Sequence, residues 1–288
     1  MFSIKKTYDL YYYLMLLLVE LVRYAESRIE LARAKNLSTY EDLHPNTRLV
    51  DNRLLRQIAG SQQFQKYLSD NKLSWINYHG LIKSLYQDLT NSEAYKNYIA
   101  SEDSYNSDKK FILRLLPDFF GTSEILEQSL EEQSIYWNDD SDFVISMIIK
   151  TLKSFKEGDI SSVTFMPMFK NEEDQAFAQT LFRKTIINRE KYYSLIKEHS
   201  KNWDVERIAF IDILIMEAAI SELIEFPYIP TKVTLNEYIE ISKYYSTDKS
   251  CTFINGILDK LINRLKCEHI IVKKGRGLIG ENESQVQP

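Results

Sequence analysis

Two lysines toward the C-terminus stand where the chain could bind phosphate. The segment YYSTDKS, residues 244–250, separates two helical patterns, with Lys243 before the break and Lys249 within it. The second helix is expected to begin at Ser246 or Thr247, and the first amide groups of a helix point outward without partners. Such an end attracts phosphate, and Lys249 would lie in its first turn. A lysine in a loop is nevertheless more often merely solvated, so the signal is weak by itself.

Two carboxylates interrupt an apolar stretch further upstream. The sequence IAFIDILIMEAAISELI, residues 208–224, is apolar nearly all round, which predicts a central buried helix. Asp212 and Glu217 lie within it, and an unpaired buried charge is costly. Two alternatives stay open for each: a salt bridge or cap inside the fold, or a surface contact with a basic partner.

A glycine stands in the middle of the last predicted helix. The stretch KSCTFINGILDKLINRLK, residues 249–266, is helical in pattern except for Gly256. A glycine in a helix interior costs roughly 1 kcal/mol relative to alanine. Close helix–helix packing or the close approach of a ligand backbone would justify that cost, and packing is favoured on physical grounds.

The sequence contains no arrangement typical of catalysis or of a metal centre. Its 4 histidines are scattered without ligand spacing. Cys251 and Cys267 fall on one predicted helix, about 24 Å apart, so they cannot bond within it. No glycine-rich phosphate loop, nucleophile elbow or acid–base carboxylate pair is found. These absences favour a binding protein and argue against a metal site.

Charge and hydrophobicity limit how the protein could bind nucleic acid or a membrane. The formal charge is -5, so any nucleic-acid site must be a local patch, such as the basic run VKKGRG at residues 272–277. The apolar run LYYYLMLLLVELV, residues 10–22, is bracketed by Asp9 and Arg23 and is too short to span a bilayer. The run predicts a buried helix. We expect a cytoplasmic protein without membrane contact.

The elements that must position these residues are helices. With only 8 glycines and 6 prolines, the chain favours long helices and few tight turns. Before residue 156, helical patterns cover residues 7–35, 52–69, 75–90, 108–119, 123–132 and 142–155. Residues 156–174, with Gly158 and Pro167, are typical of a boundary. We predict an all-α fold with a helical N-terminal region (1–157), a second helical domain (171–268) and a flexible tail (270–288).

Residues 229–261 resemble the closing segment of the NusB family of transcription antitermination factors. That family has a proline, an Asn-Glu helix ending in lysine, a loop of small or acidic residues, and Phe-Val/Ile-Asn-Gly-Val/Ile-Leu-Asp. The matching positions are Pro230, Asn236, Glu237, Lys243, Phe253, Ile254, Asn255, Gly256, Ile257, Leu258 and Asp259. Upstream, FIDILIMEAAISEL and QAFAQTLFRKTIINRE are similar to two preceding family helices. The resemblance covers about residues 171–266, and the large N-terminal region looks like that of enlarged NusB proteins with helical insertions.

The resemblance implies an all-α protein of two helical subdomains, without enzyme activity or cofactor. It implies binding to the boxA element of ribosomal RNA leaders together with NusE, which is also a small-subunit ribosomal protein. The complex helps RNA polymerase to resist termination.

Site residues follow from the same resemblance. Its implied RNA contacts are Lys243, Lys249, Thr252, Phe253, Asn255 and Gly256, at the family's final helix and the loop before it. Asp212 falls at an acidic position where the family contacts NusE, and Glu217 joins it as an expected partner contact.

The chain departs from the family pattern at its start. The family opens with an arginine-rich helix that contributes much of the RNA binding, whereas this chain opens MFSIKKTYDLYYYLM and its first arginine is Arg23. Either the chain starts downstream of the usual start, or RNA affinity has moved elsewhere, for example to the tail lysines. Alternative functions are a helical protein-binding scaffold that has lost RNA binding, and an RNA-positioning domain related to RNA methyltransferases.

Overall fold

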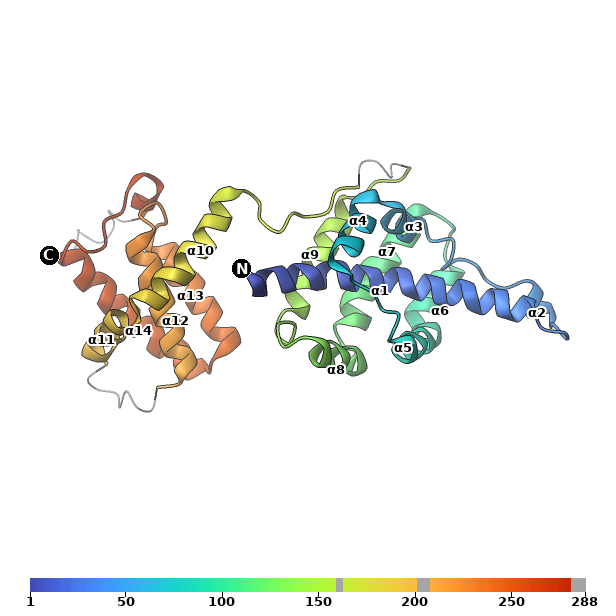
Figure 1. The fold of residues 1–288 in the computed structure, drawn as a ribbon, viewed down its shortest axis with the longest axis horizontal. Coiled ribbons are helices and arrows are strands. Elements are labelled where there is room, and N and C mark those ends of the chain that lie inside the picture. Colours follow the sequence, from blue (N-terminus) through green and yellow to red (C-terminus); the bar gives the residue numbers. More distant parts are fainter. Residues whose placement is uncertain (159–162, 201–207, 281–288) are drawn as a thin grey trace. The chain divides into compact units, whose positions relative to one another are not determined.

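The structure is a computed structural model that describes residues 1–158, 163–200 and 208–280. The chain divides into two units, Met1–Lys170 and Asn171–Pro288, which are described separately below (Figure 1). The described residues form helices, turns and loops and contain no strand. The all-α prediction is therefore confirmed.

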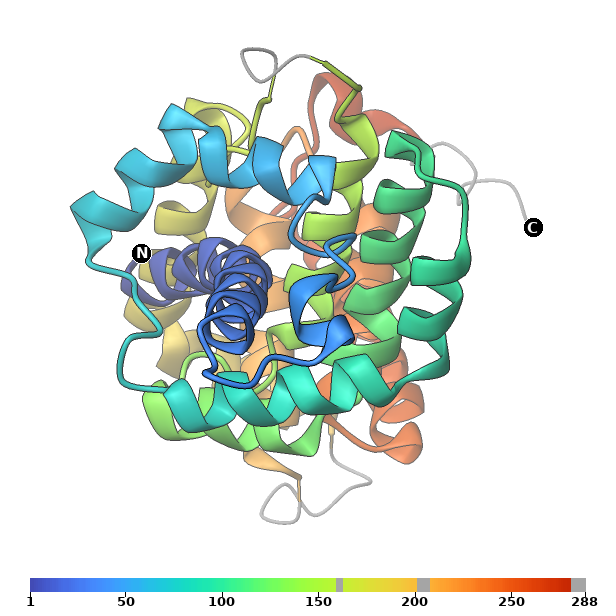
Figure 2. The ribbon, with the colours of Figure 1, turned by 90° about the vertical axis from the view of Figure 1, so that its right-hand side faces the viewer.

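Unit 1 is a helical bundle built around its first helix. Almost every side chain from residue 10 to residue 21 of this helix is buried, as the apolar run predicted. The helix packs against α2, α3, α4, α5 and α9, and Figure 2 shows the helices of this unit arranged around it. The elements of unit 1 are α1 (Phe2–Arg33), α2 (Tyr40–Leu43), α3 (Arg53–Gly60), α4 (Gln62–Asn71), α5 (His79–Asn91), α6 (Glu93–Ala100), α7 (Tyr105–Leu115), the π-helical turn η1 (Leu116–Phe120), α8 (Glu124–Gln133) and α9 (Ser141–Ser154).

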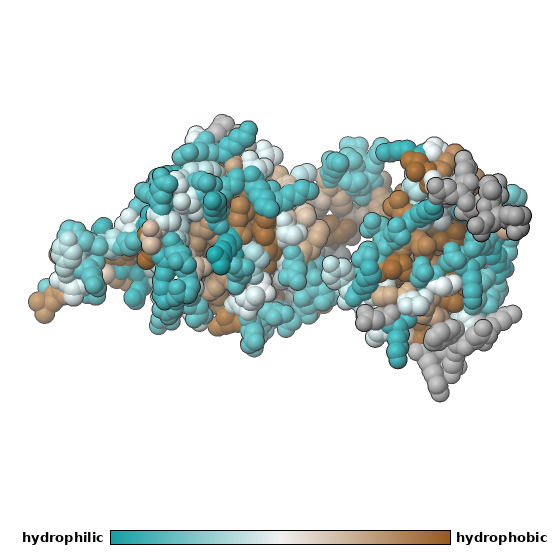
Figure 3. Space-filling view, turned by 180° about the vertical axis from the view of Figure 1, so that it is seen from behind, coloured by the Kyte–Doolittle hydropathy of each residue, from teal (hydrophilic) through white to brown (hydrophobic). Residues whose placement is uncertain are grey.

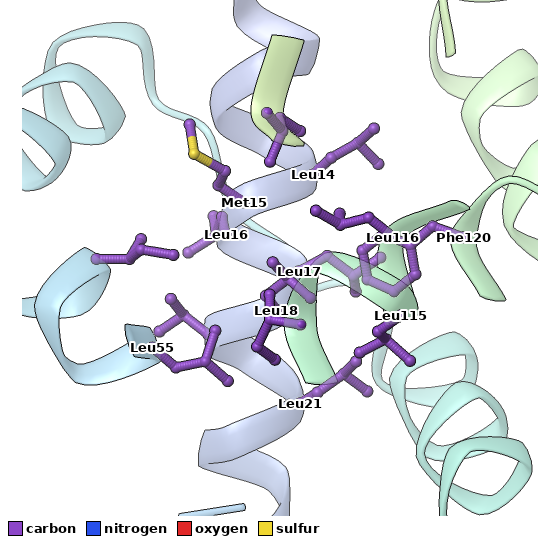
Figure 4. Close-up of a cluster of buried hydrophobic side chains, with 14 of the residues drawn as sticks. Leu14, Met15, Leu16, Leu17, Leu18, Leu21, Leu55, Leu115, Leu116 and Phe120 are labelled. Carbon is purple, nitrogen blue, oxygen red and sulfur yellow. The ribbon is translucent and has the colours of Figure 1, made fainter. Parts of the chain in front are cut away.

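Leucines from opposite sides of α1 contribute to the core of unit 1. Leu17 is fully buried, and its neighbours along the helix point both toward α3 and toward the end of α7 (Figure 4). The π-helical turn η1 continues α7 and adds Leu116 and Phe120 to this core. Figure 4 labels Leu14, Met15, Leu16, Leu17, Leu18, Leu21, Leu55, Leu115, Leu116 and Phe120 in this cluster.

A buried carboxylate lies near the N-terminal end of α1. Asp9 is buried, and its carboxylate accepts a hydrogen bond of 2.8 Å from the Tyr67 hydroxyl. The Lys6 ammonium lies 3.6 Å from the other carboxylate oxygen. The Lys5 ammonium lies 3.9 Å from the oxygen that Tyr67 contacts, and the three partners together offset the desolvation of the carboxylate.

The helix boundaries of unit 1 differ from the sequence expectation in one informative place. A single helix was predicted over residues 52–69, but Ser61 takes an extended conformation and divides it into α3 and α4. The Ser61 hydroxyl accepts from the amide of Phe64, so this serine serves as the N-cap of α4.

Unit 1 also extends beyond the predicted limit at residue 157. Phe165 is buried in its core. The Tyr8 hydroxyl donates to the carbonyl oxygen of Met166 at 2.6 Å, and the Met166 amide donates to the Tyr11 hydroxyl at 3.3 Å. The segment that was expected to be a linker thus partly covers α1.

Unit 2 is built around α12, which is apolar nearly all round. This helix packs against α10, α11, α13 and α14, so the prediction of a central buried helix over residues 208–224 is confirmed. It begins at Phe210, and the residues just upstream of 208 lie outside the described part of the chain. The elements of unit 2 are α10 (Glu172–Ile187), α11 (Arg189–His199), α12 (Phe210–Glu225), α13 (Thr231–Tyr245), α14 (Asp248–Cys267) and the 3₁₀ turn η3 (Gly275–Leu278).

Residues 270–280, which we call the C-terminal strap, lie against the turn between α12 and α13. The Lys274 amide donates to the carbonyl oxygen of Pro227 at 2.8 Å, and the Lys273 ammonium donates to that of Phe226 at 3.1 Å. Ile271 is buried in the core of unit 2. The sequence predicted a flexible tail from residue 270 onward, but this part is fixed by backbone and side-chain contacts; residues 281–288 lie outside the described residues.

No helix in the described ranges combines the length and the apolar character needed to cross a bilayer. On the face seen in Figure 3, hydrophilic side chains cover much of the surface and apolar side chains emerge in a few places.

Two substitutions in α1 test whether its buried half organises unit 1. Leu17→Ala should lower the free energy of unfolding by about 2–5 kcal/mol, because it opens a cavity at a fully buried position. Leu31→Ala on the exposed end of the same helix should change it by less than about 0.5 kcal/mol. Urea unfolding followed by circular dichroism measures both, and equal effects would contradict this description of the core.

Candidate functional site

The candidate site lies where α13 ends and α14 begins. Thr247 is the N-cap of α14, and its side-chain oxygen accepts from the amide of Ser250 at 3.3 Å. The helix therefore starts one residue beyond this cap, close to the predicted start. Lys249 lies in the first turn and is exposed, as expected. A positive end of a helix and a lysine together provide an environment that favours an anion.

Lys243 stands in the last turn of α13, on the other side of the break. Its ammonium forms an ion pair of 2.5 Å with Glu240, and both side chains are exposed. The hydrogen bond to Glu240 raises the pKa of Lys243. Because water screens such an exposed pair, Lys243 remains available to a phosphate that replaces the carboxylate.

The first half of α14 has one exposed side facing away from the core. Lys249, Thr252, Asn255 and Gly256 are all exposed, and their spacing brings them onto neighbouring positions of one helical surface. We call these four residues the α14 stripe. Phe253 is half-buried and packs against the core of unit 2 beside them. The buried side consists of Ile254, Ile257, Leu258, Leu261, Ile262 and Leu265.

Gly256 is on the open side of the helix. A Cβ atom at this position would meet no atom within 4 Å. The prediction that helix–helix packing explains this glycine is therefore wrong, because no neighbouring helix covers the position. The missing side chain leaves the helix backbone uncovered next to the exposed Asn255.

Asp212 contributes to the site from inside. It is only 3% exposed, and one carboxylate oxygen accepts a hydrogen bond from the hydroxyl of Ser246 in the α13–α14 loop. Asp212 therefore has an internal hydrogen-bond partner, and its contact with a protein partner stays a prediction. Because Ser246 immediately precedes the N-cap Thr247, the bond ties the start of α14 to the central helix.

Glu217 is buried as well, at 1% exposure. The Nε atom of Arg189 lies 3.6 Å from its carboxylate, which forms an internal ion pair. Burial raises the pKa of Glu217, and the Arg189 charge works in the opposite direction. Its carboxylate lies below the surface in this structure, and its contact with a protein partner stays a prediction.

The structure adds functional candidates that sequence reasoning missed. Tyr244 is 85% exposed beside Lys243, so its ring is open for stacking. The available signal is the aromatic pair that directly follows Lys243, but residue type alone does not distinguish an exposed ring from a buried one. Ser246 and Thr247 gain their roles from hydrogen bonds. In the part of the chain that the structure describes, no cluster of three His, Cys, Asp or Glu residues could hold a metal ion.

The Asp212–Ser246 bond can be tested by its effect on stability. Ser246→Ala should lower the free energy of unfolding by about 1.5–3 kcal/mol, since a hydrogen bond to a buried charged group is lost. Ser194→Ala removes a serine hydroxyl from the exposed face of α11 and should be nearly neutral. Urea unfolding of both variants compares them directly. A neutral Ser246→Ala variant would show that the loop is not tied in this way.

Gly256→Ala should stabilise the protein by about 0.5–1 kcal/mol, because an exposed helix-interior glycine is replaced by the best helix former. The matched change Gly277→Ala should destabilise it, since a Cβ atom there would lie 2.0 Å from the carbonyl oxygen of Pro227. Thermal unfolding distinguishes the two signs. Destabilisation by Gly256→Ala would restore the packing explanation.

Comparison with known proteins identifies the family. The NusB family model matches residues 147–263. The transcription antitermination protein NusB of Salinibacter ruber is 35% identical over 144 residues, which cover 48% of this chain and 90% of that relative.

Two further relatives carry the same name. NusB of Chloroherpeton thalassium is 42% identical over 103 residues, covering 36% of this chain and 49% of the relative. NusB of Natranaerobius thermophilus is 39% identical over 95 residues, covering 33% of this chain and 68% of the relative. No solved structure matches the chain. The similarity to NusB of Salinibacter ruber spans most of that protein, and the chain therefore belongs to the NusB family of transcription antitermination proteins.

Proposed function

We propose that this chain is a transcription antitermination factor that binds a boxA-like ribosomal RNA leader together with NusE. In this function it acts in the cytoplasm as part of an antitermination complex with RNA polymerase. It binds and positions its partners and carries out no chemical step. Family membership supports the general function, and the geometry of unit 2 supports the RNA surface.

The α14 stripe is the observation that carries the RNA part of the proposal. Its lysine lies at the capped, positive end of the helix, where a phosphate is favoured by both charge and free amide groups. Thr252 and Asn255 offer exposed hydrogen-bonding groups one turn further along, and Gly256 leaves room for close approach. Phosphate contacts fix the position of a nucleic acid, whereas contacts to base edges carry sequence information.

Single-stranded RNA fits this surface better than a duplex. Unstacked bases are recognised by aromatic stacking and by hydrogen bonds to their edges. The exposed ring of Tyr244 and the half-buried ring of Phe253 flank the loop on α13 and α14. Lys243 adds a second phosphate contact when the RNA displaces Glu240.

The NusE contact in this proposal uses the exposed start of α12 and leaves the buried carboxylates inside. Phe210 and Ile211 are exposed there, and the guanidinium of Arg189 lies 5.6 Å from the centre of the Phe210 ring. Asp212 and Glu217 support this surface from below through Ser246 and Arg189.

A second candidate function is a protein-binding scaffold without RNA affinity. The observation that favours it is the surface of α10, a helix with no buried residue. Phe182, Ile186 and Ile187 are 69%, 56% and 64% exposed. Contiguous exposed apolar side chains are typical of protein interfaces.

The decisive experiment is a titration of labelled boxA-like RNA with the full chain, with and without NusE, at two salt concentrations. RNA affinity should fall as salt rises, and NusE should strengthen it. Lys249→Glu should weaken RNA binding several-fold, because a favourable phosphate contact becomes repulsive. The charge-matched control Lys66→Glu, on the exposed surface of α4, should leave the affinity unchanged.

The other outcomes separate the two candidates. Binding to NusE without any RNA binding would favour the scaffold function. Equal loss of affinity in Lys249→Glu and Lys66→Glu would mean that only net charge matters and would remove the α14 stripe from the proposal. Binding to neither partner would contradict both functions.

A further inference from the structure

The C-terminal strap owes its position to glycine. A Cβ atom on Gly277 would lie 2.0 Å from the carbonyl oxygen of Pro227, so no other residue fits without moving the strap away from the turn. Gly275 has a φ of +52°, and a Cβ atom there would lie 3.4 Å from the Tyr228 ring. Because Gly275 and Gly277 lie close to Tyr228 and Pro227, the strap backbone at these glycines is held against the turn.

Basic side chains flank the glycines of the strap. Lys274 and Arg276 are exposed on either side of Gly275, and their side chains have no ion-pair partner among the described residues. The exposed side chain of Lys232, at the start of α13, comes within 3.3 Å of the Cβ position of Gly280. Tyr228 is 62% exposed in the same place. We call Tyr228, Lys232, Lys274 and Arg276 the strap surface.

Two carboxylates near the turn have partners of their own. Glu222 is buried and accepts a hydrogen bond of 3.1 Å from the Tyr238 hydroxyl. Glu225 forms an ion pair of 2.9 Å with Lys184 of α10. Lys274 and Arg276 therefore add two exposed positive charges beside the exposed Tyr228 ring, in a chain whose net charge is -5.

We propose that the strap surface binds single-stranded RNA, with Lys274 and Arg276 contacting phosphates and the Tyr228 ring stacking on a base. Cations alternating with an exposed aromatic ring are the combination by which proteins bind single strands. An anionic membrane is a poorer match, because the net charge of the chain opposes it and the short 3₁₀ turn offers no amphipathic helix.

This surface extends the proposed function to the other end of α13. Lys232 and Lys243 are eleven positions apart on that helix, which corresponds to about 16 Å. An RNA strand that contacts the α14 stripe can therefore continue along α13 to the strap surface. The inference rests on the proposed function only for the identity of the RNA, since the strap surface requires no particular sequence.

The test titrates the full chain with labelled oligouridine and with boxA-like RNA over a range of salt concentrations. The double variant Lys274→Gln/Arg276→Gln should weaken the binding of both RNAs. It should also make the slope of log affinity against log salt concentration shallower by about 1.4, because two phosphate contacts at about 0.7 each are lost. The control Lys66→Gln/Lys83→Gln removes two exposed lysines of unit 1 and should leave the slope unchanged. Thermal unfolding verifies that each variant keeps its fold.

The ring is tested separately from the charges. Tyr228→Leu should weaken oligouridine binding about 5- to 150-fold, the range measured for loss of one base–aromatic stack, without changing the salt slope. Tyr228→Phe keeps the stacking ring and should bind as the unchanged protein does. Equal loss in both variants would point to the hydroxyl and overturn the stacking role.

The outcomes distinguish this inference from the proposed function. If Lys249→Glu weakens boxA-like RNA while the strap variants bind like the unchanged protein, the strap inference is overturned and the proposed function stands. If the strap variants weaken RNA binding and Lys249→Glu does not, the strap surface is supported and the α14 stripe is excluded as an RNA contact. Absence of any RNA binding overturns both. Strap-dependent binding to phosphatidylserine vesicles without RNA binding would also overturn the inference in favour of a membrane surface.

Discussion

Each unit depends on one helix that is apolar on nearly every side. Such a helix cannot lie on a surface, because water would contact whichever side was left uncovered. In unit 1 the first half of α1 is enclosed by α3, α4, α5 and α9, and in unit 2 α12 is enclosed by α10, α11, α13 and α14. The enclosing helices need only one apolar side each, and their other sides are free for binding. The stripe on α14 exists because its opposite side is used to cover α12.

Charged groups inside these two helices connect the cores to the surface. Asp9 holds Tyr67 of α4 against α1, and Asp212 holds the loop that starts α14. A buried carboxylate is costly unless it is paired, so its partner has little freedom to move. In unit 2 this restriction acts directly beneath the candidate RNA surface. Ser246 is fixed by the core, and Thr247 then caps the helix end that attracts phosphate.

The glycines of unit 2 have opposite physical explanations. Gly256 lies in open space, and its value is what it leaves uncovered on α14. Gly277 lies close to the carbonyl oxygen of Pro227, and only a residue without a Cβ atom lets the strap approach the turn this closely. Gly256 leaves helix backbone exposed, whereas Gly277 fixes the backbone of the strap. In the proposed function the negative net charge of the chain requires a local binding surface, since no global field draws RNA in.

Much of the fold followed from periodicity alone. An apolar run flanked by charges identified the buried half of α1, and an apolar stretch with two acids identified α12, because burial on all sides requires uninterrupted apolar sequence. The order Pro, Asn-Glu, Lys and Phe-Ile-Asn-Gly-Ile-Leu-Asp identified the family. The break of α3 and α4 at Ser61 was missed, because serine is compatible with both a helix interior and a cap, and only the backbone conformation decides.

The sequence by itself determined the all-α class, the two helices that must be central, and the family to which the chain belongs. The tertiary structure alone decided which polar residues reach the surface. Asp212 and Glu217 looked like partner contacts, but whether a carboxylate on an apolar helix faces water depends on the helices that cover it. Gly256 looked like a packing residue, but no neighbour covers it. The strap surface joins residues from the α12–α13 turn and from the end of the chain, and sequence periodicity carries no information about which distant segments meet.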